Sequence, residues 1–274
     1  MSSIKINEST CIKDGLCSTI CPMQIIVPPK GGIPPEPKPE FSKWCIGCGH
    51  CVAICPTGAI SHSIMHPDQC PPADYKSIPG PDQFEKILRL RRSVRRFKRK
   101  SPEKETLKRL IKMAGYAPSG HNLQSVRWQV FADREDLKTL VGLACDWMKH
   151  TLHEMPEAPN APVFKEVIQA RDQGKDLILH DAPCLVMVHS TIRIGTEPTD
   201  AAISLAYFDL AALSLGLGCC WAGLFTMAAK SWEPLKQYLE LPKGHKLHGA
   251  MMTGYPKFEF QRLPVRKLPG IQWR

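Results

Sequence analysis

The sequence lacks several features that would place the protein in familiar classes. It has no run of eighteen or more apolar residues, and its first ten residues, MSSIKINEST, contain neither a basic nor an apolar stretch. These absences argue against a membrane span and a secretory signal, so a cytoplasmic location is expected. The sequence also has no GxGxxG motif, which would mark a separate dinucleotide-binding fold. No Ser/His/Asp or paired-carboxylate set calls for a mechanism of its own.

The length and the cysteine content narrow the remaining classes. The chain has 274 residues, 43% of them hydrophobic, which suits one or two domains with a real core. Twelve residues are cysteines. Because the cytosol keeps thiols reduced, this number predicts metal binding or redox chemistry and not a disulfide framework. Seven of the cysteines fall in two short runs; the other five occupy apolar or loop contexts typical of small buried residues, at Cys70, Cys145, Cys184, Cys219 and Cys220.

Positive charge is concentrated in one segment. Residues 89–112 contain twelve Lys and Arg against Glu103 and Glu105, so this segment carries the whole formal excess of +10. Such a block is typical of a nucleic-acid patch, of a solvated face, or of a fold that contains an anion site.

The two cysteine runs almost repeat each other. Residues 11–22 read CIKDGLCSTICP and residues 45–56 read CIGCGHCVAICP. The second run fits the iron–sulfur pattern CxxCxxCxxxCP without exception, and the first has the same spacing with Asp14 in place of the second cysteine. The candidate ligands are Cys11, Asp14, Cys17, Cys21, Cys45, Cys48, Cys51 and Cys55.

The runs resemble those of two-cluster bacterial ferredoxins over roughly residues 1–70. In that arrangement the fourth cysteine of each run ligates the other cluster. One cluster is then held by Cys21, Cys45, Cys48 and Cys51, and the second by Cys11, Cys17, Cys55 and the group at Asp14. Asp14 either ligates the fourth iron of a [4Fe-4S] cluster or leaves a three-iron, [3Fe-4S] site. Zinc is disfavoured, because zinc sites use CxxC pairs in tetrahedral sets of four ligands and do not call for a third close cysteine. Cys70 is either a replacement ligand or a free thiol.

Proline marks the domain boundary. Seven prolines between Pro22 and Pro39 predict an extended loop over the cysteine module, and a second group, Pro71, Pro72, Pro79 and Pro81, follows it. We therefore expect a 2[4Fe-4S] ferredoxin-like domain over residues 1–75 and a second domain over residues 76–274.

Periodicity predicts alternating helices and strands in the second domain. Residues 82–93 and 101–117 read as helices, the latter with Ser101 as its N-cap and Pro102 at its first position. Residues 128–132, 184–189 and 247–255 read as strands, the middle one central because it is apolar throughout. Residues 200–216 are apolar nearly all round, which predicts a buried helix. Residues 232–239 predict a further helix. The proline-interrupted stretch 155–176 is either a lid or an exposed connection.

Five motifs of this domain, taken in order, are similar to those of the nitroreductase superfamily of FMN enzymes. They are RRSVRRF (91–97), APSGHNLQ (117–124), GLGCCWAGLF (216–225), GYP (254–256) and RLPVRK (262–267). The resemblance covers residues 82–274. It implies an α+β chain: a small ferredoxin-like two-cluster iron–sulfur domain followed by a nitroreductase-fold α/β sandwich, with a mixed sheet flanked by helices.

The resemblance also implies where FMN binds. Arg91 and Ser93 face the phosphate with Arg92 close by. Arg95 approaches the N1/O2 edge of the ring, where a cation stabilises the charge that reduction adds. The remaining implied contacts are Pro118, Ser119, Asn122, Gln124, Ala222, Gly223, Arg262 and Arg266. His121 either donates a proton near the flavin or makes a local hydrogen bond. Cys219 and Cys220 are expected to be packing residues and not a redox pair.

The complete chain thus resembles a ferredoxin–nitroreductase fusion. This implies an iron–sulfur flavoprotein oxidoreductase that passes electrons from the clusters to FMN, which reduces a planar acceptor such as a nitroaromatic or a quinone. It further implies a homodimer, and an external donor that is either reduced ferredoxin or NAD(P)H. Two alternatives remain: a non-catalytic electron-transfer subunit of a larger redox complex, and a redox sensor that binds nucleic acid. Nucleic acid is disfavoured, because three basic residues of segment 89–112 belong to the implied FMN site and its one aromatic residue is Phe97.

Overall fold

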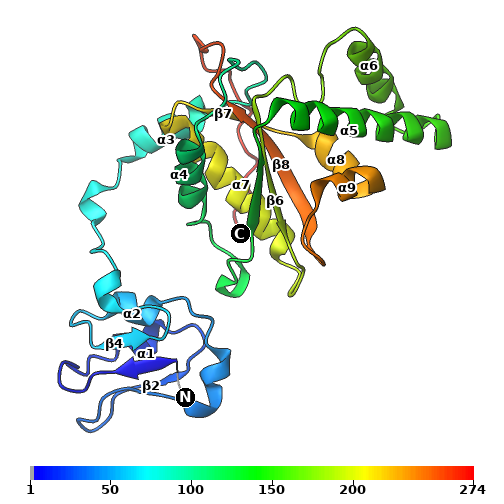
Figure 1. Ribbon diagram of the computed structural model, residues 1–274. Helices are drawn as coiled ribbons and strands as arrows, with labels where there is room; N and C mark the ends of the chain where they lie inside the picture. Colours follow the sequence, from blue (N-terminus) through cyan, green and yellow to red (C-terminus); the bar gives the residue numbers. More distant parts are fainter. Residues whose placement is uncertain (1–2) are drawn as a thin grey trace. The chain divides into compact units, whose positions relative to one another are not determined.

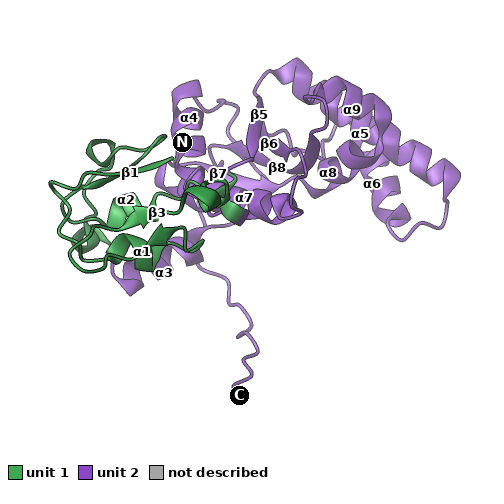
Figure 2. Ribbon diagram, turned by 90° about the horizontal axis from the view of Figure 1, so that it is seen from below, with its two compact units in different colours: residues 1–78, 121–123 green, residues 79–120, 124–274 purple. Residues whose placement is uncertain are grey.

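The computed structural model describes residues 3–274, which form two compact units (Figure 2). Unit 1 runs to Ile78 and also includes His121–Leu123. Unit 2 comprises Pro79–Gly120 and Gln124–Arg274. Among the helices of residues 3–274, none has the length and apolar character needed to cross a membrane.

Unit 1 is built from two short ribbons and two short helices. Strand β1 pairs antiparallel with β4, and β2 pairs antiparallel with β3. The proline-rich stretch supplies the β2–β3 ribbon, as the predicted extended conformation requires. The elements are β1 (Ile4–Ile6), α1 (Leu16–Ile20), β2 (Ile26–Val27), β3 (Glu36–Pro37), α2 (His50–Ile54) and β4 (Ile60–His62).

Unit 2 is a four-stranded sheet with helices on both faces (Figure 1). The strand order is β5-β6-β8-β7, and all three pairs are antiparallel. The single parallel pairing in residues 3–274 is an isolated bridge between Ser93 and Cys219 beside β7, so the predicted mixed character of the sheet is limited to that contact. The strands are β5 (Arg127–Phe131), β6 (Cys184–Ser190), β7 (Gly218–Trp221) and β8 (Lys246–Gly254). The helices are α3 (Pro81–Leu90), α4 (Lys104–Ala114), α5 (Arg134–Glu154), α6 (Ala161–Asp172), α7 (Glu197–Ser214), α8 (Gly223–Ser231) and α9 (Glu233–Leu239).

Strand β6 divides the core of unit 2 into two layers. All seven of its residues are buried, which confirms its predicted interior position. Successive side chains of a strand point to opposite faces. Leu185 and Met187 therefore join the core under α5, α6, α8 and α9, whereas Val186 and Val188 join the core under α4 and α7.

Three sequence expectations for unit 2 were wrong in detail. Helix α4 begins at Lys104 and not at Ser101, because the Ser101 hydroxyl donates to the carbonyl oxygen of Pro183 instead of capping the helix. Helix α7 is buried on one side only, and the side chain of Tyr207 is 41% exposed. Segment 155–176 is not an exposed connection, because it contains helix α6, which buries Phe164 and is packed against α5; its part as a lid stays a prediction.

Candidate functional site

Each cysteine run forms a loop followed by one short helix. Helices α1 and α2 begin after glycines in the left-handed conformation, Gly15 (φ 72°) and Gly49 (φ 73°). Glycine adopts this conformation without steric cost. Each helix ends just before the last cysteine of its run, Cys21 or Cys55, which is the C-cap residue.

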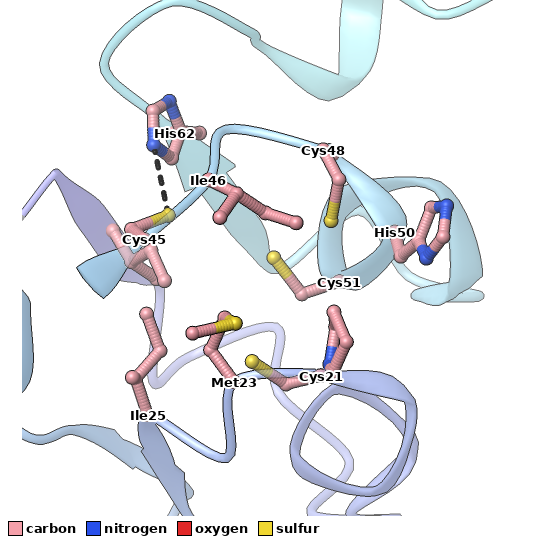
Figure 3. Close-up of a pocket in the computed structure, with 12 residues that line it drawn as sticks. Cys21, Met23, Ile25, Cys45, Ile46, Cys48, His50, Cys51 and His62 are labelled. Atoms are coloured by element: carbon pink, nitrogen blue, oxygen red, sulfur yellow. Dashed lines mark hydrogen bonds between the residues drawn. The ribbon is translucent and has the colours of Figure 1, made fainter. Parts of the chain in front are cut away.

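The second run and the last cysteine of the first run surround one pocket. Its lining includes Cys21, Cys45, Cys48 and Cys51 together with apolar side chains such as Ile25. Figure 3 shows these four sulfur-bearing side chains, from two separate loops, around the same pocket. This is the crossed set expected from the spacing.

A second pocket brings together the other set. It is lined by Cys11, Asp14, Cys17 and Cys55, again with apolar residues around them. The Asp14 carboxylate is exposed in the loop before α1, and its Oδ1 accepts a hydrogen bond from the Leu16 amide at 3.1 Å. A hard carboxylate oxygen therefore takes the place of one soft sulfur in this set.

Burial controls the charge state of these thiols when no cation is bound. It raises the pKa of Cys51 to about 11, with the neighbouring Cys21 and Cys48 sulfurs adding to the rise. Burial also raises the pKa of Cys17. At Cys55 burial acts in the same direction, but hydrogen bonds from the Thr57 hydroxyl and nearby backbone amides outweigh it and lower the pKa. A bound cation would deprotonate such thiols, because the thiolate is the form that ligates metals.

The donor chemistry of both pockets fits iron–sulfur clusters. Soft sulfurs from separate loops converge on apolar surroundings in each case, as such clusters require. Within residues 3–274, no three His, Cys, Asp or Glu side chains lie close enough together to hold one metal ion. The donors are instead spread around the two pockets.

In unit 2, the segment RRSVRRF lies beside β7. The Val94 amide donates to the Cys219 carbonyl at 2.9 Å, and Ser93 forms a parallel bridge with Cys219. This close approach needs glycine at position 218, because a Cβ there would overlap Val94 Cγ2. The packing fixes the backbone of Ser93 next to the strand that leads into α8.

The arginines of this segment differ in their partners. Arg91 Nη1 lies 3.0 Å from Asp209 Oδ2, on the buried side of α7. Burial raises the pKa of Asp209, although the Arg91 charge opposes the rise. Arg92 places its guanidinium 6.0 Å from the centroid of the Phe260 ring. Its Nε is buried and has no hydrogen-bond partner among the described residues. Arg95 is exposed.

Loop 117–124 has an unusual backbone. His121, Asn122 and Gln124 all have φ between 46° and 53°, a conformation that costs about 1–3 kcal/mol per non-glycine residue and is concentrated at functional sites. Ser119 Oγ accepts from the Gln124 amide at 3.0 Å, and Pro118 and His121 are exposed. Within unit 1, Asn122 Nδ2 donates to the carbonyl oxygens of Ile46 (3.3 Å) and Gly47 (3.1 Å).

The two residues predicted near flavin N5 have different backbone environments. The Ala222 amide donates to the Ala250 carbonyl at 2.9 Å, so it is already used by the sheet. Gly223 is the first residue of α8, where the amide has no acceptor within the helix, and the space around a Cβ there is open. Of the pair, Gly223 is the better placed to donate to a ligand.

The C-terminal arginines stand apart from the segment RRSVRRF. Arg262 and Arg266 are both exposed, and neither makes a hydrogen bond or an ion pair with any residue from 3 to 274. The whole stretch 257–274 is exposed and has no helix or strand. Their part in a phosphate site stays a prediction.

The remaining cysteines have structural environments. Cys219 and Cys220 lie on β7 and pack into the cores on opposite faces of the sheet. Burial raises the pKa of both thiols. These features suit packing residues and not a redox pair. Cys70 Sγ donates to the His66 carbonyl oxygen at 3.5 Å, outside the two cysteine pockets.

The sequence analysis missed three side chains that matter to these sites. Asp209 is the one charged residue of the stretch 201–214 of α7, a signal that could have revealed it as the partner of a buried cation. His62 lies 3.5 Å from Cys45 Sγ, and Thr57 Oγ1 lies 3.6 Å from Cys55 Sγ. Their only sequence signal is their place after the second run.

Comparisons with known proteins agree with this two-part architecture. The model of the nitroreductase family matches residues 88–255, and a model described as a 4Fe-4S dicluster domain matches residues 10–60. Because the first match covers more than half of the chain, the protein belongs to the nitroreductase family. It is an oxidoreductase of that family with a 4Fe-4S dicluster domain ahead of the nitroreductase domain.

Individual relatives are distant. Iodotyrosine deiodinase of Thermotoga neapolitana is 26% identical over 171 residues, which are 62% of this chain and 87% of that protein. A nitroreductase with bound FMN from Bacteroides fragilis has a TM-score of 0.58 at 20% identity, covering 69% of this chain and 98% of that one. A BluB-like flavoprotein from Clostridium difficile has a TM-score of 0.56 at 22% identity, covering 68% and 94%. The structural likenesses establish the fold.

Proposed function

We propose that this protein is an iron–sulfur flavoprotein in which unit 1 holds two clusters and unit 2 binds FMN. The clusters deliver electrons to FMN, and the reduced protein acts on a planar acceptor such as a nitroaromatic or a quinone. The observation that carries the proposal is the sorting of seven cysteines and Asp14 into two crossed sets around two pockets, in a chain that continues into a nitroreductase domain.

The FMN assignment rests on the family and on the environment of Arg92. Its Nε is a buried donor that no described group satisfies, and leaving such a donor unpaired is costly. A phosphate beside Arg92 and Ser93 would satisfy it with a charge-assisted hydrogen bond. The Arg91 guanidinium is paired with Asp209, which anchors the first residue of the segment RRSVRRF to α7. When bound, FMN would supply one- and two-electron chemistry.

Three uncovered apolar surfaces support a homodimer. Helix α7 exposes Tyr207, and α3 leaves every large apolar side chain exposed: Phe84, Ile87, Leu88 and Leu90. The C-terminal stretch exposes Val265 (98%) and Trp273 (87%). Large apolar side chains left exposed in such numbers are typical of an interface, and a second copy of the chain is the occupant we propose. Light scattering should give twice the chain mass, and deletion of residues 258–274 should lower it; a monomer that retains FMN contradicts the dimer.

The basic segment supports an acidic protein as the electron donor. Ten of its Lys and Arg side chains are exposed, and seven of them follow RRSVRRF in the chain: Lys98, Arg99, Lys100, Lys104, Lys108, Arg109 and Lys112. Only Lys100 and Lys108 of these have a carboxylate partner among the described residues, Glu103 and Glu105. A positive face accelerates association with an acidic carrier such as reduced ferredoxin, in a salt-dependent way. Reduction by ferredoxin that falls steeply with salt, and falls again in a Lys104→Glu/Lys112→Glu variant, supports this donor; reduction by NAD(P)H alone contradicts it.

The first experiment measures what the protein holds. After anaerobic purification, iron, acid-labile sulfide and FMN per chain are determined, and EPR spectra are recorded before and after dithionite. About eight irons and one FMN per chain support two four-iron clusters with Asp14 as a ligand. About seven irons with a three-iron signal place a [3Fe-4S] cluster at the Asp14 site. Absence of FMN contradicts the flavoenzyme; bound FMN without turnover of nitroaromatics or quinones favours an electron-transfer subunit.

A further inference from the structure

The two halves of unit 1 match residue by residue at a constant offset of 34 positions. Cys11, Cys17 and Cys21 correspond to Cys45, Cys51 and Cys55. The backbone follows the same correspondence: Lys13 and Gly47 have φ of 62° and 60°, and Gln24 and Gly58 have φ of 52° and 64°. Each half therefore has a structural control in the other.

Two positions beside the cysteines break this internal symmetry in side-chain chemistry. His62 corresponds to Pro28, and Thr57 corresponds to Met23. His62 Nε2 lies 3.5 Å from Cys45 Sγ, and Thr57 Oγ1 lies 3.6 Å from Cys55 Sγ. Neither Pro28 nor Met23 has a side-chain donor. By the crossed sets, Cys45 lines the first pocket and Cys55 the second. Each pocket thus has one side-chain donor that the other lacks.

The hydrogen bonds of the His62 ring determine its tautomer. Nδ1 accepts a hydrogen bond from the Ile64 amide at 3.2 Å. The neutral ring must then carry its proton on Nε2, which points at Cys45 Sγ (Figure 3). A cysteine that ligates iron is a thiolate and can only accept. The contact is therefore an N–H···S hydrogen bond from His62 to a cluster ligand.

We infer that His62 raises the reduction potential of the cluster held by Cys21, Cys45, Cys48 and Cys51, and does not act on the other cluster. This inference rests on the proposed iron–sulfur function of unit 1. One electron enters the cluster on reduction, no bond to Cys45 breaks, and the proton stays on Nε2. A donor aimed at a ligand sulfur stabilises the added negative charge, which is one of the ways in which proteins set cluster potentials. His62 thus acts on the cluster through the ligand Cys45 and is a positioning residue, not a ligand.

Two substitutions at His62 distinguish the effect of its hydrogen bond to Cys45 from the effect of the imidazole ring itself. His62→Asn keeps an acceptor near the Nδ1 position for the Ile64 amide but has no donor that reaches Cys45 Sγ. His62→Gln places an amide N–H near the position of Nε2. The measurement is an EPR-monitored redox titration of the anaerobically purified full chain. H62N should lower the reduction potential of this cluster by ~59 mV, which is a tenfold change in the equilibrium constant of a one-electron couple. H62Q should restore most of that shift.

Two further variants act as controls. Thr57→Val removes the donor at Cys55 and should lower the potential of the other cluster only. His50→Gln changes an exposed histidine that lines the same pocket without a hydrogen bond to sulfur in residues 3–274, and should leave both potentials unchanged. Asp14→Cys identifies the EPR signal of the cluster held by Cys11, Cys17 and Cys55, because it changes the ligands of that cluster alone.

A spectroscopic measurement on the unsubstituted protein covers the case in which H62N loses its cluster. With ¹⁵N-labelled histidine, pulsed EPR of the reduced protein should detect coupling of one imidazole nitrogen to one cluster. Absence of that coupling overturns the inference, as does an H62N protein with full iron content and unchanged potentials, or one in which both clusters shift equally. Wild-type protein without iron and sulfide would instead contradict the proposed function itself.

Discussion

Unit 1 and unit 2 build their cores in different ways. Among the described residues, the core of unit 1 has seven buried members, and two of them are the candidate ligands Cys17 and Cys51. Unit 2 buries 23 residues on one face of its sheet and 13 on the other, and none of them is a candidate ligand. A chain of under about 80 residues rarely obtains enough stability from its core and uses staples such as metals. Unit 1 should therefore depend on its clusters, and unit 2 on packing.

Removal of the clusters gives the largest expected effect. Chelation with oxidation should unfold unit 1 completely, because its buried thiols lose the iron that holds them together. Limited proteolysis should then degrade residues up to Ile78 and leave a fragment of unit 2. The thermal transition of unit 2 serves as the internal control. Equal loss of both units would mean that they do not fold independently.

A large-to-small substitution in the core of unit 2 should have the converse effect. Phe208 is fully buried on α7 and stacks on Trp128 at 5.4 Å between ring centroids. Phe208→Ala should lower the free energy of unfolding of unit 2 by about 3–5 kcal/mol, through lost burial and a cavity. Denaturant titration followed by tryptophan fluorescence measures this. Lys138→Ala, at an exposed position, is the control, and the iron content should not change in either variant.

The proposed phosphate site gives an effect of intermediate size. Arg92→Ala should weaken FMN binding by about 1.5–3 kcal/mol, the range for a hydrogen bond to a charged group. Arg92→Lys keeps the charge but loses Nε of the planar fork, so it should fall between wild type and alanine. Fluorescence titration of the FMN-depleted protein measures the dissociation constant. Arg99→Ala, an exposed change on the same segment, should leave it unaltered; equal affinities for all three variants would remove Arg92 from the site.

The same contrast explains which features the sequence could predict. Cysteine spacing predicts three members of each ligand set because short-range loop geometry determines which side chains of one run face the same pocket. The fourth member, from the other run, is predicted by the resemblance to two-cluster ferredoxins. An unbroken apolar run predicts β6 because every residue of a central strand is buried. The prolines of 155–176 do not exclude a helix, because Pro162 lies in the first turn of α6, where its missing amide costs nothing.

Contacts between distant segments could not be predicted in this way. Ser101 has the right chemistry for an N-cap, but the Pro183 carbonyl 82 positions away takes its hydroxyl. His62 reaches Cys45 only because β4 and the loop of the second run fold next to each other. Tertiary packing also determines which arginine has a buried nitrogen without a hydrogen-bond partner among the described residues. Arg92 is such a residue, and the sequence does not distinguish it from its neighbours.

Proton uptake by a buried histidine of unit 2 gives the smallest expected effect. His189 is buried on β6, with its Nδ1 2.8 Å from that of His245. Burial lowers the pKa of His189, and the neighbouring charges of His245, His248 and Arg127 lower it further. The unfolded chain takes up a proton near the ordinary value of about 6.5, while the folded unit resists protonation until a lower pH. The stability of unit 2 should thus be full above a pH of about 6.5 and decrease as the pH falls below it.

Denaturant titrations at pH 7.5 and 5.5 measure this effect as a difference in the free energy of unfolding. The difference should be smaller for His189→Asn than for wild type, whereas His153→Gln, at an exposed site, should behave as wild type. An unchanged difference in His189→Asn would assign the pH dependence to other groups.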